Sequence, residues 1–276
     1  MKNSLLLFGF IVSFIFSSCT KQPSASFTTD KTSIEEKQTI TFTNTSSEAL
    51  SYKWDFGDGT SSTDQSPSHT YNTAGNYTVS LTAYSKKEKK SDTYTQSITV
   101  KKESYRFTGT VGSSSLSYIV DGSGMYENSF SNGSSINTPP SLSTKTFGST
   151  IGYVLGSGYP ALTIEIGQLS YSGGMIAPSS SFRNYITASS YSFSVGPVAG
   201  VAVTFIDVSG TIWRSDKGSA NQSGSSFIIS EATPGTNLSG DEQIVFKANF
   251  SCKLYDDNGN SVQLSNGYMY AAFGNI

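Results

Sequence analysis

WDFGDGT occupies residues 54–60 of this chain, and it is followed by PSHTY at residues 67–71 and by GNY at residues 75–77. Trp54 and Phe56 are two residues apart, so a strand would place both side chains on one face. Gly57 and Gly59 permit the positive φ angles that a tight turn needs. Every second residue from 77 to 83 is apolar, which predicts a longer strand after the turn and its loop.

In this order and spacing the three blocks resemble the PKD (polycystic kidney disease) domain, an immunoglobulin-like β-sandwich. The resemblance covers residues 24–101, under a third of the chain. It implies a fold and an extracellular setting, but it implies no ligand, because one fold hosts many functions. It also implies that Asp55 and Asp58 cap backbone N–H groups of the turn, and that His69 packs and hydrogen-bonds at the edge of the sandwich.

The basic run KKEKK at residues 86–90 follows the longer strand. We expect a solvated hairpin tip there, since charge on an exposed turn also discourages edge pairing. The alternative is a basic contact for an anionic glycan or a lipid headgroup. Residues 101–103, which read KKE, are the best candidate for a linker to a second domain.

The amino terminus reads as a targeting segment. Lys2 is followed by an apolar run at residues 5–16, which is too short for the roughly 20 residues of a membrane-spanning helix. FSSC at residues 16–19 resembles the lipobox of bacterial lipoproteins, although Phe16 stands where Leu is usual. The resemblance implies that residues 1–18 are a signal peptide and that Cys19 carries a lipid anchor. The alternative is ordinary secretion.

These features place the protein in the bacterial cell envelope, lipid-anchored at the outer membrane or cell surface. Residues 19–23 would then be a short tether, residues 24–101 the PKD-like domain and residues 104–276 a second domain of ordinary size. The net charge of −2 gives no reason to expect a nucleic-acid partner. Membrane contact through the lipid, and a glycan or an envelope protein, are the expected partners.

Only strand and turn signals follow residue 104, so we expect an all-β chain whose second domain is an antiparallel β-sandwich or jelly-roll. Asn258-Gly259 lies between alternating apolar runs and predicts a hairpin. Asn266-Gly267 predicts a second turn, and hence a three-stranded meander. The segment from residue 210 onward looks like the tails of other bacterial surface lipoproteins, which names no activity.

Few residues of this sequence are candidates for metal ligands. Asp55, Asp58 and Asp64 surround a glycine-rich turn and could offer oxygen ligands to calcium, but capping the turn is the simpler role. A zinc site is not expected, because His69 and Cys252 lie in different domains. Cys252 alternates with apolar residues and is expected in the core. We therefore expect no cofactor, with calcium as the alternative.

Catalytic signals are weak. A Ser-His-Asp arrangement would have to use His69, and no pair of carboxylates can be matched from the sequence to the groove that a glycosidase needs. The acidic residues of the second domain are Asp121, Glu127, Glu165, Asp207, Asp216, Glu231, Asp241, Glu242, Asp256 and Asp257. We therefore assign no catalytic residue.

Aromatic side chains are the remaining candidates for glycan binding, although most aromatics in a sandwich are core packing. Trp213, Tyr159 and Tyr171 are the candidates we single out, and Trp213 precedes a charged stretch at residues 214–216. Further candidates are Tyr153, Tyr185, Tyr191, Tyr268 and Tyr270. The sequence thus predicts a non-catalytic surface lipoprotein whose PKD-like module presents a glycan- or protein-binding β domain. The alternative is a secreted hydrolase that acts on a polysaccharide.

Overall fold

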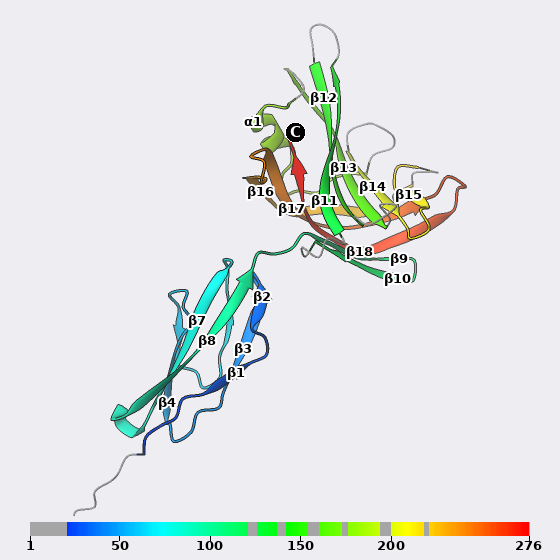
Figure 1. Ribbon diagram of the computed structural model, residues 1–276. Helices are drawn as coiled ribbons and strands as arrows, with labels where there is room; N and C mark the ends of the chain where they lie inside the picture. The colour runs from blue at the N-terminus through cyan, green and yellow to red at the C-terminus, as the bar shows by residue number, and fades with distance from the viewer. Residues whose placement is uncertain are drawn as a thin grey trace, which may run out of the picture. The chain divides into compact units, whose positions relative to one another are not determined.

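The computed structural model describes residues 21–120, 126–136, 142–153, 160–172, 176–193, 200–217 and 221–275 (Figure 1). The chain divides into two compact units, one ending at Glu103 and the other beginning at Ser104. Both units are built from strands, so the all-β prediction is confirmed. Within the described residues, no helix has the length and apolar character needed to cross a bilayer.

The first unit is a sandwich of two sheets. The smaller sheet has the order β1 (Phe27–Thr29), β3 (Thr39–Asn44) and β6 (Ser68–Thr70). The larger sheet has the order β2 (Ser33–Glu35), β8 (Ser91–Lys101), β7 (Gly75–Tyr84), β4 (Ser51–Asp55) and β5 (Ser61–Ser62). Its pairs are antiparallel except β2 with β8. The basic run forms the tip between β7 and β8, where Lys86–Glu88 make one short 3₁₀ turn.

The WDFGDGT turn is held by a compact polar and aromatic network. The His69 ring stacks on Phe56 at a centroid distance of 4.1 Å, and its Nε2 donates to Asp58 Oδ2 at 2.8 Å. Asp58 Oδ1 accepts hydrogen bonds from the backbone N–H and the hydroxyl of Thr60. Gly57 has a φ of +80°, and a Cβ there would lie 2.7 Å from the Thr78 carbonyl oxygen, so only glycine fits.

We expect Asp58→Asn to destabilise the first unit by about 1–2 kcal/mol, because charged hydrogen bonds to Thr60 and His69 become neutral or are lost. Burial alone would raise the pKa of Asp58, but its hydrogen bonds from Thr60 and His69 hold that pKa below its ordinary value. A carboxyl with a depressed folded pKa adds stability above its unfolded pKa and loses it as pH falls through the folded pKa. The difference between the two proteins should therefore be full above about pH 4 and shrink at lower pH. Urea unfolding followed by Trp54 fluorescence in a Trp213→Phe background measures it.

Asp64→Asn is the matched control for this prediction. At Asp64 the hydrogen bonds to Trp54 and Ser62 are made by backbone atoms, so the substitution should change unfolding little. Equal unfolding of the Asp58 variant and the native protein at neutral pH would contradict the role assigned to the Asp58 carboxylate.

The strands that the structure describes in the second unit form one antiparallel sheet of ten strands. Its order is β10-β9-β18-β17-β15-β14-β13-β12-β11, and β16 pairs with β17 beside β15. The strands are β9 (Arg106–Val111), β10 (Ser114–Ile119), β11 (Tyr126–Ile136), β12 (Leu142–Tyr153), β13 (Ala161–Ser172), β14 (Gly200–Ile206), β15 (Ile212–Arg214), β16 (Ser226–Thr236), β17 (Glu242–Tyr255) and β18 (Ser261–Gly274). The sheet curls back on itself (Figure 1), so that the Ala272 N–H of β18 donates to Asn128 Oδ1 of β11 at 3.1 Å. One continuous apolar core fills the space inside the curl.

The predicted three-stranded meander is wrong, because β18 runs unbroken from Ser261 to Gly274. The Asn258-Gly259 hairpin is present, but Asn266 and Gly267 form a bulge at which the register with β17 shifts. A Cβ on Gly267 would lie 2.8 Å from the Phe250 carbonyl oxygen. Glycine is therefore needed here because β17 and β18 approach closely, and not because the chain reverses direction.

Strand and turn signals also missed a short helix, α1 (Ser179–Tyr185). Pro178 precedes its first turn, and Phe182 is its one buried residue. Two helical turns are too short to show a 3.6-residue periodicity, so the sequence pattern could not distinguish α1 from a loop.

Candidate functional site

The β14–β15 hairpin presents the best candidate site of the second unit. Asp207 opens its turn, and Asp207 Oδ1 accepts hydrogen bonds from the Ser209 N–H and hydroxyl and from the Thr211 N–H. Its other oxygen accepts a hydrogen bond from Trp213 Nε1 at 3.1 Å. Burial acts to raise the pKa of Asp207, but these donors hold it below its ordinary value. A single carboxylate therefore fixes both the turn and the indole ring.

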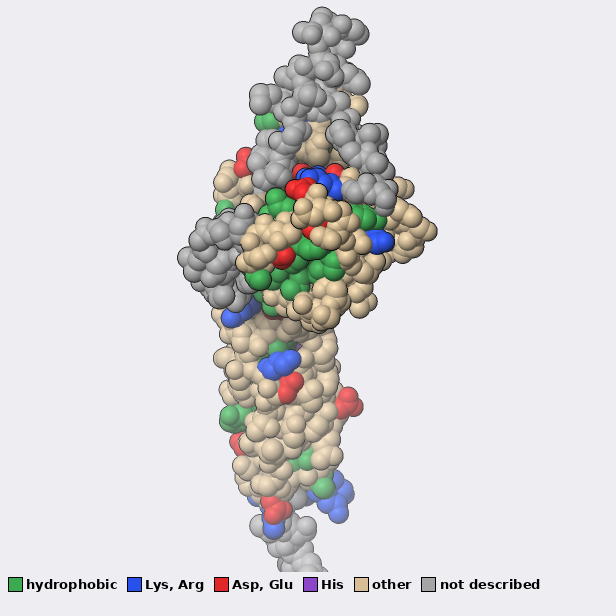
Figure 2. Space-filling view, turned by 90° about the vertical axis from the view of Figure 1, so that its right-hand side faces the viewer, with side chains coloured by type: hydrophobic (Ala, Val, Ile, Leu, Met, Phe, Trp, Pro, Cys, Tyr) green, Lys and Arg blue, Asp and Glu red, His purple; other side chains and the backbone are tan. Residues whose placement is uncertain are grey.

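Trp213 lies on the core side of the sheet but is only partly buried. It is opposite Phe205 in the register, and both side chains pack against the core. On the same face, Val111, Leu116 and Val262 are also partly exposed, and we call these three residues with Trp213 the apolar end. Figure 2 views the side on which β9, β10 and β15 lie in Figure 1, and it shows hydrophobic side chains gathered there with charged groups around them.

The other face of β15 carries an ionic group. Arg214 makes two parallel hydrogen bonds to Asp216, at 2.8 and 2.9 Å, and its Nη2 lies 3.9 Å from Glu165 Oε2. Burial acts to raise the pKa of Asp216, whereas Arg214 lowers it below its ordinary value. Glu165 thus lies on the face of β13 opposite the core. Two carboxylates that share one guanidinium suit planar polar recognition or surface stability more than proton transfer.

The other sequence candidates are dispersed. Tyr171 is buried in the core, whereas Tyr159 lies outside the described residues, as does the side chain of Tyr153. The Tyr191 hydroxyl bonds backbone atoms of Thr187 and so holds the chain after α1. The remaining aromatic candidates also make internal contacts: Tyr185 packs on Phe147 and the core, Tyr270 packs on Tyr105 and Lys247, and Tyr268 has an interaction within the chain.

Apart from Glu165, Asp216 and Asp257, whose charges all act on Arg214, the described acidic residues of the second unit make separate contacts. Glu231 pairs with Lys247, and Glu242 binds Arg183 and Asn275. The Asp241 carboxylate accepts a hydrogen bond from the Asn237 side-chain amide, Asp256 caps a turn, and Asp257 pairs with Lys217. Asp121 and the side chain of Glu127 lie outside the described residues.

Two of the three calcium candidates, Asp55 and Asp58, use their carboxylates within the turn, whereas the hydrogen bonds of Asp64 are made by its backbone atoms. Asp55 Oδ1 accepts the Gly57 N–H at 2.9 Å, Asp58 binds Thr60 and His69, and the Asp64 carbonyl accepts Trp54 Nε1. Among the described residues, no group of three or more His, Cys, Asp or Glu is arranged to hold a metal ion. Cys252 is fully buried, and burial raises the pKa of its thiol to about 12, so it is a core residue. Cys19 lies outside the described residues.

Sequence reasoning missed a buried lysine. Lys145 of β12 is 1% exposed, and its Nζ lies 3.5 Å from Asn275 Oδ1 and 5.6 Å from the centroid of the Phe147 ring. Burial lowers the pKa of this amine. Asn275 also donates to the Ala177 carbonyl and to Glu242, so the group ties β12 and the segment before α1 to the end of the β17–β18 pair where β17 begins and β18 ends. No motif marks Lys145, because its partners are distant in sequence.

Comparisons with known proteins agree with the geometry of the first unit. A segment of 54 residues is 46% identical to Collagenase ColA of Bacillus cereus, which is 20% of this chain and 6% of that protein. The PKD1 domain of the Vibrio cholerae metalloprotease PrtV is 38% identical, covers 29% of this chain and 99% of its own, and has a TM-score of 0.26. The PKD1 domain of Vibrio anguillarum Epp is 32% identical over 30% of this chain and 96% of its own, with the same TM-score.

A further structural likeness spans both units. A carbohydrate-binding module of the β-sandwich superfamily covers 93% of each chain, but with 14% identity and a TM-score of 0.29 it supports no argument here. The family model that matches the sequence covers residues 20–100 and is described as the PKD domain. The fold, the turn network and these relatives agree, and the first unit of this chain is a PKD domain.

Proposed function

We propose that this protein is a lipid-anchored, non-catalytic binding protein of the bacterial cell envelope, displayed at the outer membrane or cell surface. In this proposal Cys19 carries the lipid, the PKD domain is a spacer, and the second unit binds a glycan. The observation that carries the binding role is the Trp213 indole, which Asp207 fixes at the apolar end.

The PKD domain has the geometry of a spacer. The chain enters beside the start of β8, where Gln22 Nε2 donates to the Ser91 carbonyl. It leaves after Lys101, at the other end of the same strand. Eleven residues of strand extend about 36 Å. The domain therefore separates its point of attachment from the residues that follow it.

The apolar end is better suited to binding a glycan than to catalysing a reaction that needs a nucleophile. Sugar rings present C–H faces to an aromatic plane and hydroxyls to planar polar groups. Trp213 supplies the plane, and the exposed Val208 adds apolar surface in the turn of the same hairpin. Asp207 is already saturated by hydrogen bonds, and Asp216 is bound to Arg214, which supports positioning rather than general acid–base catalysis.

Binding should depend on Trp213. We expect Trp213→Ala to weaken the affinity for the preferred glycan on an array by at least about tenfold, because a centrally placed Trp contributes most to such contacts. Trp213→Phe, which keeps an aromatic face, should retain part of the affinity. Isothermal titration with the best array ligand measures both.

Ile228→Ala is the control, since Ile228 is also an exposed apolar residue of the second unit and lies on β16. It should leave affinity unchanged. Absence of any glycan ligand for the folded native protein would overturn the glycan role. Pull-down of an envelope protein by the same chain would favour the protein-binding alternative, and release of sugar fragments would favour a hydrolase.

Anchoring should depend on Cys19. We expect Cys19→Ala to move the protein from the membrane fraction to the soluble fraction, because the thiol is the acceptor for the lipid and stable anchoring needs more than one acyl chain. Intact-mass spectrometry should show the native chain starting at Cys19 with an added acyl mass. A native chain that keeps residues 1–18 and carries no acyl group would contradict the anchor.

A further inference from the structure

Three segments of the PKD domain meet where the described chain begins. Lys21 Nζ lies 2.6 Å from Glu48 Oε1, and the Ser24 N–H donates to the Ser47 carbonyl. The Leu50 N–H donates to the Tyr84 carbonyl, which joins this loop to the end of β7. We call the surface formed by residues 21–24, 46–50 and 85–90 the anchor end.

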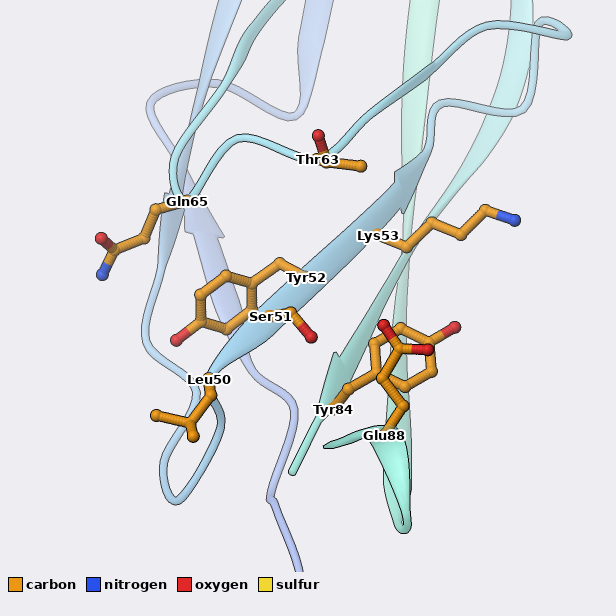
Figure 3. A pocket seen from close by; sticks show the side chains of 8 residues that line it. All are labelled: Leu50, Ser51, Tyr52, Lys53, Thr63, Gln65, Tyr84 and Glu88. Carbon is orange, nitrogen blue, oxygen red and sulfur yellow. The ribbon is translucent and has the colours of Figure 1, made fainter. Parts of the chain in front are cut away.

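An exposed leucine stands at the anchor end. Leu50 is 71% exposed, directly before the first residue of β4. It borders an open groove whose other walls include Tyr52, Tyr84 and Glu88 (Figure 3). The same leucine, with Lys86, also lines a second hollow beside Lys21. Single exposed apolar side chains are common on protein surfaces, so the groups around Leu50 decide whether it has an external partner.

The charge around Leu50 is mainly positive. Six lysines lie at or beside the anchor end: Lys21, Lys53, Lys86, Lys87, Lys89 and Lys90. Three carboxylates lie there: Glu48 pairs with Lys21, Asp92 accepts the Ala25 N–H, and Glu88 is in the hairpin tip. The tip is held by Ser85, whose hydroxyl accepts the Lys90 N–H and whose own N–H donates to the Lys90 carbonyl. Four lysines are therefore presented on an ordered turn.

We propose that the anchor end docks on the headgroups of an anionic lipid bilayer. The four tip lysines contact lipid phosphates, and Leu50 enters the boundary between headgroups and acyl chains. The inference rests on the proposed lipid anchor for its location: Cys19 is two residues before Lys21, and two residues span at most about 7 Å. An acylated Cys19 therefore brings this surface, and no other end of the PKD domain, against the membrane.

The chemistry of the anchor end favours an anionic lipid bilayer as its partner. Lysines attract anionic headgroups by roughly a fivefold factor in partition for each charge near the surface. An isolated exposed leucine adds apolar contact at the depth where lysine stems can also lie along acyl chains.

Vesicle binding of residues 21–276, which contain both units but lack Cys19, tests the docking without the lipid. At low ionic strength and on the order of millimolar lipid we expect co-sedimentation with phosphatidylglycerol vesicles and little with phosphatidylcholine vesicles. The combined variant Lys86→Gln, Lys87→Gln, Lys89→Gln and Lys90→Gln should reduce partition by at least about tenfold. Leu50→Ser should reduce it by a few-fold at unchanged charge.

The matched control neutralises Lys37, Lys101 and Lys102, which lie at the other end of the domain, and it should keep native partition. Circular dichroism shows whether each variant is folded. Equal sedimentation with both lipids, or native partition of the folded four-lysine variant, would overturn the proposal. Because these chains cannot be acylated, failure of the lipid anchor in cells and failure of docking give separate results.

Discussion

Burial of the Trp54 indole is the interaction on which the PKD domain depends. The ring is fully buried, with centroids 5.0 Å from Phe27 and 5.6 Å from Phe42, and Nε1 donates to the Asp64 carbonyl. Removing such a side chain costs about 3–5 kcal/mol, a large part of the 5–15 kcal/mol that stabilises a typical domain. Because Trp54 fixes β4, it also fixes both ends of that strand: the WDFGDGT turn at one end and Leu50 at the other.

The turn was predictable because its interactions are local. Phe56, Asp58, Thr60 and His69 lie within fourteen residues of one another, so the types and spacing of these residues already specify the contacts. The second unit is different. Asn266-Gly267 is compatible with a hairpin or with a bulge, and the choice depends on pairing with β17, whose residues lie up to 24 positions earlier. An unbroken β18 keeps more backbone groups hydrogen-bonded than a turn would, and no local pattern shows this.

The residues of the candidate site also fall into those that the sequence pattern could place and those that it could not. Alternation correctly placed Cys252 in the core. It could not show that Val111 and Val262, about 150 residues apart, reach the surface beside each other, because that follows from the β18–β9 register. Nor could it distinguish Tyr171, which is buried, from Trp213, which is only partly buried, because only the curl of the sheet determines which end of the core is exposed.

The proposed anchor and the proposed docking surface reinforce each other through effective concentration. A lysine-rich tip with one leucine binds a bilayer weakly when the protein is free in solution, since each contact is worth only about 1 kcal/mol. A lipid two residues from Lys21 would hold the same surface at an effective concentration of about millimolar or above. Weak contacts then become populated without new interactions. One lipid attachment fixes only a position, whereas added contacts from Leu50 and the hairpin tip also restrict the tilt of the PKD domain. With its entry and exit at opposite ends of β8, a domain restrained in this way directs the exit at Lys101 away from the membrane instead of along it.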